Sequence, residues 1–484
     1  MDRKILSTKL TNQTQDLIAN RMSTVQATTE FLIFVKASQE LASEYLADST
    51  LFPLEEGIRL IRLAVRASHA VGITQWILEV KSNDPVVQSF QLNLSPITDL
   101  DSLLKKQSDL LQNLDPLKDP EGYEAQISIL YNLMEILGSQ GRLDKMREYL
   151  SQARNSYLKE LPNQLLSYIF ARVIGLIAWW EREKGDVDQA KKLNTEALEL
   201  ANDINSESLL GFTYTLIGAL YSQEGDVKKA LEHYKKAKEV RESIGDELRA
   251  TGNESSMAWD VMALGRPHEA MELLKNAYTK YKRLLPPGRL PSGVVLYLAD
   301  VCRIGGLLDD ALKYAKEAYN YSTQADTETY AAGGARVTLA SILIDRGELN
   351  EAQQILEELA KTIKAVPMDY IIFGYYYELG RLELQRRNFG QADEALQEAL
   401  RWASKPGNFD PLLKTQLSLT QLYIQEYRMT DNLLFLNKAR VFIENVVQAT
   451  YEQEFIYLLY QALILRSNIE ALQGQNDDAL KTLN

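Results

Sequence analysis

The chain has 484 residues, of which 45% are hydrophobic, and its 53 basic and 66 acidic residues give a formal net charge of -13. This length allows about three ordinary domains, or one array whose core grows along its length. The negative charge argues against a general affinity for nucleic-acid backbones, which require clustered Lys and Arg. We therefore expect no nucleic acid as a direct partner.

The sequence shows no sign of secretion or membrane insertion. Its opening residues, MDRKILSTKLTNQTQD, lack an apolar stretch of signal-peptide length, and no run of 18 or more apolar residues occurs. The single cysteine, Cys302, excludes an internal disulfide framework and a cysteine-based zinc site. A cytoplasmic protein without a membrane partner is expected.

Residues 1–81 are predicted to form a degenerate or capping helical hairpin. Its two amphipathic stretches are VQATTEFLIFVKASQELASEYL and LEEGIRLIRLAVRASHA. Residues 82–122 differ in character, because NDPVVQSFQLNLSPITDLDS contains prolines and β-favouring residues and LDPLKDPEG is a break. This second segment is expected to be an irregular connection.

From residue 123 to 401 the chain repeats itself. A short break followed by an amphipathic helix recurs as GDVDQA, GDVKKA, GRPHEA, GLLDDA, GELNEA and NFGQA. The last alanines of these stretches are spaced by 40, 40, 41, 41 and 40 residues, at Ala190, Ala230, Ala270, Ala311, Ala352 and Ala392. Such a constant period in a chain without low-complexity bias indicates stacked structural repeats.

Each repeat unit is predicted to be a helical hairpin. In one unit, the apolar stretch LLGFTYTLIGALYSQ precedes the break and the amphipathic ALEHYKKAKEV follows it. Gly225 suits the end of the first helix, and Asp226 suits the N-cap of the second. The small residues Gly218 and Ala230 permit the two helices to cross closely. Tyr221 and Tyr234 fill the space around this crossing.

Proline-containing stretches interrupt the pattern twice. RLLPPGRLPSG at 283–293 cannot be helical throughout, yet it leaves the alanine spacing unchanged and is expected to be a rigid connection, as is KPGNFDP at 405–411. Residues 402–484 are expected to be divergent repeats. Because the sequence stops soon after a helix begins near Asp477, it is expected to be a fragment of a longer protein.

No catalytic or metal-binding motif is evident. His69, His233 and His268 lie on separate units without an acidic residue at metal-ligand spacing, so surface or capping histidines are expected. A P-loop, a dinucleotide fingerprint and a G-x-S-x-G elbow are absent from the sequence. Cys302 occupies the packing place that Tyr221 holds in its own unit, which argues against a reactive thiol. We expect neither an enzyme nor a cofactor.

The pattern of small and large residues resembles a known repeat family. Gly218, Tyr221, Ala230, Tyr234 and Ala237, with the break at Gly225, resemble the signature of the tetratricopeptide repeat. The likeness is clear over residues 167–401. The familiar unit has about 34 residues. Because the units of this chain recur every 40 or 41 residues, the pattern resembles the long-repeat branch of the family. The resemblance implies an all-α fold, a right-handed superhelical solenoid of stacked antiparallel helical hairpins.

In this family the first helix of each hairpin lines the concave face. The residues at positions two, five, six and nine of each repeat unit face the ligand. Carried over to this sequence, the resemblance implies a partner-binding surface made of Arg172, Leu176, Trp179, Phe212, Thr215, Leu216, Ser255, Ser256, Trp259, Leu296, Tyr297, Asp300, Val337, Thr338, Ser341, Tyr377, Glu378 and Arg381. This set has several aromatics and few charges, which favours an apolar or amphipathic peptide. Aromatics at helical spacing are, however, more often packed in a core than in contact with a ligand.

Glycine holds the second place in four successive units, at Gly252, Gly293, Gly334 and Gly374. Glycine near a helix start weakens the helix by up to about 1 kcal/mol relative to alanine. Two interpretations stay open. The glycines begin helices or let neighbouring first helices pack tightly, or they form a smooth strip against which a bound chain lies.

The resemblance implies a non-catalytic protein–protein interaction scaffold or adaptor, whose concave groove holds an extended or helical segment of another protein. The basic clamp for a terminal carboxylate and the asparagine ladder of some family members are absent at these places, which argues against their ligands. The alternative is a ligand-sensing or regulatory module of a larger signalling ATPase or transcription regulator. A third reading is self-association through exposed terminal hairpins.

Overall fold

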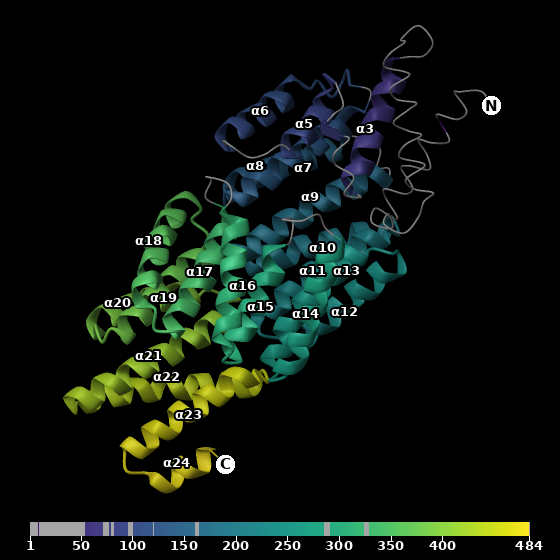
Figure 1. Ribbon diagram of the computed structural model, residues 1–484. Coiled ribbons are helices and arrows are strands. Elements are labelled where there is room, and N and C mark those ends of the chain that lie inside the picture. Colours follow the sequence, from purple (N-terminus) through teal and green to yellow (C-terminus); the bar gives the residue numbers. More distant parts are fainter. Residues whose placement is uncertain are drawn as a thin grey trace.

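The computed structural model describes Thr8 and residues 54–70, 77–78, 82–94, 100–119, 121–159, 164–284, 291–323 and 329–483. All regular elements in this part of the chain are α-helices, and from α7 onward they form consecutive antiparallel pairs. Figure 1 shows α3–α7 at one end of the molecule and α22–α24 at the other. The helices are α3 (Leu54–Ala70), α5 (Pro85–Leu94), α6 (Leu100–Asn113), α7 (Gly122–Ser139), α8 (Leu143–Tyr157), α9 (Gln164–Glu183), α10 (Val187–Asp203), α11 (Glu207–Glu224), α12 (Val227–Ser243), α13 (Glu247–Ala263), α14 (Pro267–Leu284), α15 (Ser292–Ile304), α16 (Leu308–Ser322), α17 (Tyr330–Asp345), α18 (Leu349–Ala365), α19 (Asp369–Gln385), α20 (Phe389–Ala403), α21 (Phe409–Thr430), α22 (Leu433–Glu452), α23 (Ile456–Leu472) and α24 (Asn476–Leu483).

The six regularly spaced alanines occupy one equivalent place in six hairpins. Each is the fourth residue of a second helix, from α10 to α20, and each is completely buried. A larger side chain at this crossing would hold the paired helices apart. On the first helix of one hairpin, a Cβ added to Gly218 would lie 2.8 Å from the Tyr234 ring. The predicted alternation of small and large residues is therefore confirmed.

The turns within the hairpins follow the predicted chemistry. Gly225 ends α11 in the left-handed conformation, with a φ of 84°, which glycine adopts without steric strain. Asp226 then caps α12, because its carboxylate accepts a hydrogen bond of 3.2 Å from the Lys229 amide. Asp186 caps α10 in the same way.

The described residues between 82 and 122 include two helices, α5 and α6, which corrects the expectation of an irregular connection. Pro85 is the first residue of α5, where the missing amide hydrogen costs little because first-turn amides have no acceptor within the helix. Val86, Val87 and Phe90 are buried in the core. The proline and the β-branched residues that indicated irregular structure therefore begin a helix and pack its inner face.

Part of the predicted N-terminal hairpin lies outside the described residues, including the whole of VQATTEFLIFVKASQELASEYL, while LEEGIRLIRLAVRASHA forms α3. A buried ion cluster holds α3. The Arg62 guanidinium, 1% exposed, pairs with Asp84 at 2.7 Å and with Asp119 at 2.5 Å, and Arg66 pairs with Glu121 at 2.9 Å. These pairs tie α3 to the start of α5 and to the turn before α7.

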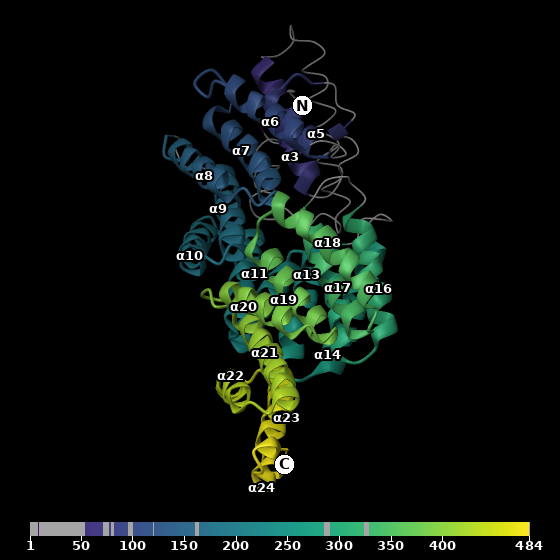
Figure 2. The same cartoon turned by 90° about the vertical axis from the view of Figure 1, so that its left-hand side faces the viewer.

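The divergent C-terminal region continues the hairpin pattern. Helix α21 pairs with α22, and α23 pairs with α24. In place of a glycine, Asp431 adopts the left-handed conformation between α21 and α22, with a φ of 54°. Figure 2 shows α24 at the end of the molecule, beyond α23.

The solenoid winds tightly enough for hairpins far apart in the sequence to touch. The Gln223 amide donates to Asn408, 185 residues away, at 3.2 Å. Lys228 pairs with Glu454 at 2.6 Å, across 226 residues. The Phe409 ring lies so close to Gly225 that an added Cβ would be 2.4 Å from it. We call this set of contacts the inter-turn seam, and it brings α21 and α23 next to α11 and α13.

Candidate functional site

First helices of five consecutive hairpins enclose a cavity of about 450 Å³, which we call the inner-wall cavity. Its lining comes from α15, α17, α19, α21 and α23. Because each unit repeats the same helix orientation, equivalent places on successive first helices face the same side of the solenoid. The cavity is therefore a product of the repeat.

Seven of the eighteen residues predicted to contact a partner line this cavity, from α15, α17 and α19. They are Asp300, Val337, Thr338, Ser341, Tyr377, Glu378 and Arg381. Two further predicted residues lie beside it. Trp259 stacks on Tyr297 with ring centroids 6.4 Å apart, and it meets Tyr457, a lining residue on α23, edge-on at 6.2 Å.

The predicted residues of the first two units pack against neighbouring helices. Phe212 and Leu216 approach to within 2.3 Å and 3.0 Å of a Cβ added at Gly175, so they occupy the space that this glycine leaves open. The Arg172 guanidinium lies 4.2 Å from the centre of the Phe212 ring, sandwiched into the same packing. These contacts join α9 to α11.

Hydroxyl and apolar side chains account for the remaining predicted residues. Three hydroxyls donate to backbone carbonyls four residues earlier in their helices, those of Thr215, Ser255 and Ser256. Three apolar side chains lie half-buried against the core, those of Leu176, Trp179 and Leu296. None of these six residues lines the inner-wall cavity.

A chain of charged side chains crosses the cavity wall. Arg381 donates to Ser341 at 2.9 Å and to Glu378 at 2.6 Å, and it also pairs with Asp345. Arg303 donates to the other oxygen of Asp345 at 3.0 Å. Asp345 therefore bridges arginines from two helices that flank its own.

A second charged group comes from α21 and α23. Lys414 pairs with Asp410 at 2.6 Å, and its ammonium lies 4.9 Å from the centre of the Trp259 ring. Tyr457 donates its phenol proton to Asp410, and burial raises the pKa of Tyr457 well above its usual range. The phenol therefore stays protonated at neutral pH and remains a donor.

The charged and polar lining residues that sequence reasoning missed include Arg303, Asp345, Asp410, Lys414 and Tyr457. Arg303 and Asp345 lie about one helical turn beyond the ninth position of their repeat units, which is the last position that the family resemblance assigns to the ligand. Asp410, Lys414 and Tyr457 lie beyond residue 401, where the family resemblance assigned no ligand-facing positions. The cavity is consequently more highly charged than the predicted residues alone indicated.

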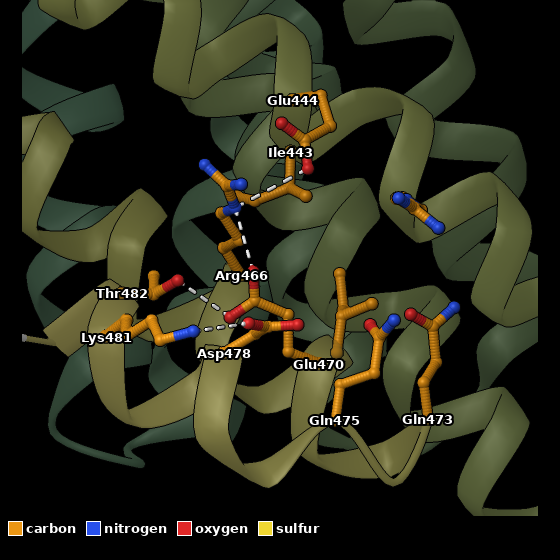
Figure 3. Close-up of a pocket in the computed structure, with 11 residues that line it drawn as sticks. Ile443, Glu444, Arg466, Glu470, Gln473, Gln475, Asp478, Lys481 and Thr482 are labelled. Carbon is orange, nitrogen blue, oxygen red and sulfur yellow. Dashed lines mark hydrogen bonds and ion pairs between the residues drawn. The ribbon is translucent and has the colours of Figure 1, made fainter.

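A separate pocket of about 330 Å³ lies between α22, α23 and α24 (Figure 3). Arg466 points toward Glu444 and Glu470, at 3.5 Å and 3.1 Å, and Lys481 pairs with Asp478 at 3.2 Å. The pair Arg466–Glu444 joins α23 to α22, whereas the other two pairs each lie within one helix.

The described residues offer no group of three His, Cys, Asp or Glu side chains that could hold a metal ion. Cys302 is buried, and burial raises the pKa of its thiol to about 11, so the nucleophilic thiolate is scarce at neutral pH. His233 stacks on Tyr221 with centroids 5.5 Å apart, whereas His268 is exposed. Within the described residues, no helix has the length and hydropathy needed to cross a membrane.

These features define an α-solenoid of stacked helical hairpins. Family models of the tetratricopeptide repeat match residues 170–243 and 373–406. The chain therefore contains tetratricopeptide repeats. Its hairpins recur every 40 or 41 residues, which makes them longer than the unit of about 34 residues typical of the family.

Several solved structures are similar to the chain. A Rap protein complexed with competence and sporulation factor is 14% identical, with a TM-score of 0.48, over 73% of this chain and 99% of that one. The apo quorum sensor NprR from B. thuringiensis is 14% identical, with a TM-score of 0.44, over 71% and 96%. The human IFIT1 dimer with PPP-AAAA is 14% identical, with a TM-score of 0.43, over 85% and 92%. No curated protein matches the sequence. Similarity at this level concerns the fold and identifies no ligand.

Proposed function

We propose that the protein is a non-catalytic interaction scaffold, which binds an extended peptide segment of another protein in the inner-wall cavity. A cytoplasmic location and binding without direct nucleic-acid contact belong to the same proposal. The tetratricopeptide repeat is generally an interaction scaffold, and the cavity is the feature of this chain that supports a defined binding place. Its volume falls within the range of about 300–1,000 Å³ typical of ligand pockets.

The arrangement of amide side chains at the cavity carries this proposal. Gln385, Gln421 and Gln461 line it from α19, α21 and α23, and all three are exposed. A glutamine amide both donates and accepts hydrogen bonds, as a peptide backbone does. Three such groups on successive first helices therefore match an extended chain, whose backbone groups also recur along its length.

A display selection with random peptides tests the proposal. Peptides selected on the wild-type protein are expected to lose binding to Gln421→Trp, because an indole at this position fills part of the cavity. The matched control is Gln354→Trp, at an exposed position on α18 outside the cavity, which should retain binding. Peptides that bind both variants equally well would place the binding surface elsewhere.

A further inference from the structure

The inner-wall cavity carries an excess of negative charge. Its charged lining residues are four carboxylates and three cations: Asp300, Asp345, Glu378, Asp410, Arg303, Arg381 and Lys414. Each cation has a carboxylate oxygen within 3.0 Å. The cations are thus already neutralised, and an anionic ligand would have to break one of these pairs.

Asp300 is the carboxylate of this lining whose negative charge is least balanced by a nearby cation. Its cation partner is Arg303, whose Nε lies 3.6 Å from Oδ1, longer than a hydrogen bond, and the closer contact of Arg303 goes to Asp345. The Asp300 side chain is 24% exposed and lines the cavity. Burial raises the pKa of Asp300, as expected for a carboxylate whose negative charge is incompletely balanced.

Aromatic rings make the same wall favourable for cations. The Arg381 guanidinium lies 5.7 Å from the centre of the Tyr377 ring, and the Lys414 ammonium lies 4.9 Å from that of Trp259. The face of an aromatic ring attracts a cation through its quadrupole. Tyr370 adds a further ring to the lining.

We propose that the cavity recognises a positively charged group of its ligand, an alkylammonium or guanidinium, and that Asp300 is its anchor. The inference rests on the proposed function, since a lysine or arginine side chain of a bound peptide would supply this group. A free amine offers the same chemistry. The test therefore includes both sources.

The peptide arm uses pools of N-acetylated, C-amidated heptapeptides with random flanks and Lys, Arg, Gln or Glu at the central position. Fluorescence competition gives the affinity of each pool. The Lys and Arg pools are expected to bind at least about tenfold more tightly than the Gln pool, because a hydrogen bond to a charged group is worth about one decade or more in affinity. The Glu pool is expected to bind most weakly.

Substitution of the anchor separates its role from general charge. Asp300→Asn is expected to abolish the preference for basic pools, and Asp300→Lys to reverse it toward the Glu pool. The matched control is Asp188→Asn, which removes one negative charge from an exposed site on α10, and it should keep the wild-type preference. Thermal unfolding confirms that the variants are folded.

The free-amine arm uses spermidine and arginine amide, with binding followed by calorimetry. Peptide binding without a basic preference would overturn this inference and leave the proposed function intact. Binding of the amines alone, lost in Asp300→Asn, would support a cation site and contradict a peptide scaffold. If neither basic peptides nor amines bind, the cation site is refuted.

Discussion

Asp260 on α13 is a completely buried carboxyl group whose ionisation should control stability. Its Oδ1 accepts a hydrogen bond of 2.7 Å from the Ser222 hydroxyl, whereas no donor from the described residues reaches Oδ2. Burial raises the pKa of Asp260 from 3.8 to about 8. The folded protein therefore keeps this group protonated at neutral pH, while the unfolded chain ionises it.

The pH dependence that follows has a definite sign. Because the folded pKa lies above the unfolded value, the stabilisation from the bound proton is complete below pH 3.8 and is lost as the pH rises through about 8. Each pKa unit corresponds to about 1.4 kcal/mol. Between about pH 5 and about pH 8, these two pKa values give a loss of up to about 4 kcal/mol.

Asp260→Asn is expected to remove this loss. Asparagine keeps the acceptor for Ser222 and does not ionise, and its amide nitrogen, left without an acceptor, costs about 1–3 kcal/mol at every pH. Relative to wild type, the variant should therefore gain up to about 4 kcal/mol between about pH 5 and about pH 8. Urea unfolding followed by circular dichroism at several pH values measures the difference.

The exposed Asp188 provides the control, since Asp188→Asn should differ from wild type by a nearly constant amount across the same pH range. A constant difference for Asp260→Asn would mean that Asp260 titrates alike in the folded and unfolded states. That result would refute the argument from burial.

Three further perturbations test the fold. Arg62→Leu should lower the free energy of unfolding by about 3–5 kcal/mol, because Asp84 and its neighbours would stay buried without a counter-charge. Lys228→Ala, which removes an exposed ion pair, should lower it by less than about 1 kcal/mol. Urea titrations of the two variants measure the difference. Phe409→Ala should open the inter-turn seam, so that amide hydrogens around Gly225 exchange faster than in the wild type while those of α9 exchange at the same rate. Unchanged exchange around Gly225 would contradict the seam. The buried Cys302 thiol should react with an aromatic disulfide reagent at least about a hundredfold more slowly in the folded protein than in urea, and similar rates would show it to be accessible.

The repeat itself was predictable because its determinants are local. The spacing of Ala190 to Ala392 and the pair Gly225–Asp226 each describe one helix crossing or one turn, and both are confirmed. The helix α5 was not predicted, since Pro85 serves equally well at a helix start and in a break. That ambiguity is resolved only by the buried contacts of the helix.

The inner-wall cavity was only partly predictable, for a different physical reason. Asp300 and Arg381 follow from the place of a residue within its own repeat. Lys414 and Tyr457 face the cavity because a small rotation between successive hairpins accumulates over several units and brings α21 and α23 into reach. This rotation depends on side-chain packing between units and leaves no periodic signal, and the same holds for the contact between Phe409 and Gly225.

The four glycines at the second place show how packing and the cavity are linked. A Cβ on Gly374 would lie 2.6 Å from Val337, whereas an added Cβ on Gly293 would meet nothing within 4 Å. The four therefore do not share one role. Gly374 lets α17 and α19 approach closely, and these two helices supply the linked pair Asp345 and Arg381. Here the tight-packing interpretation holds, and the close approach that it permits brings a charged network into the wall of the inner-wall cavity.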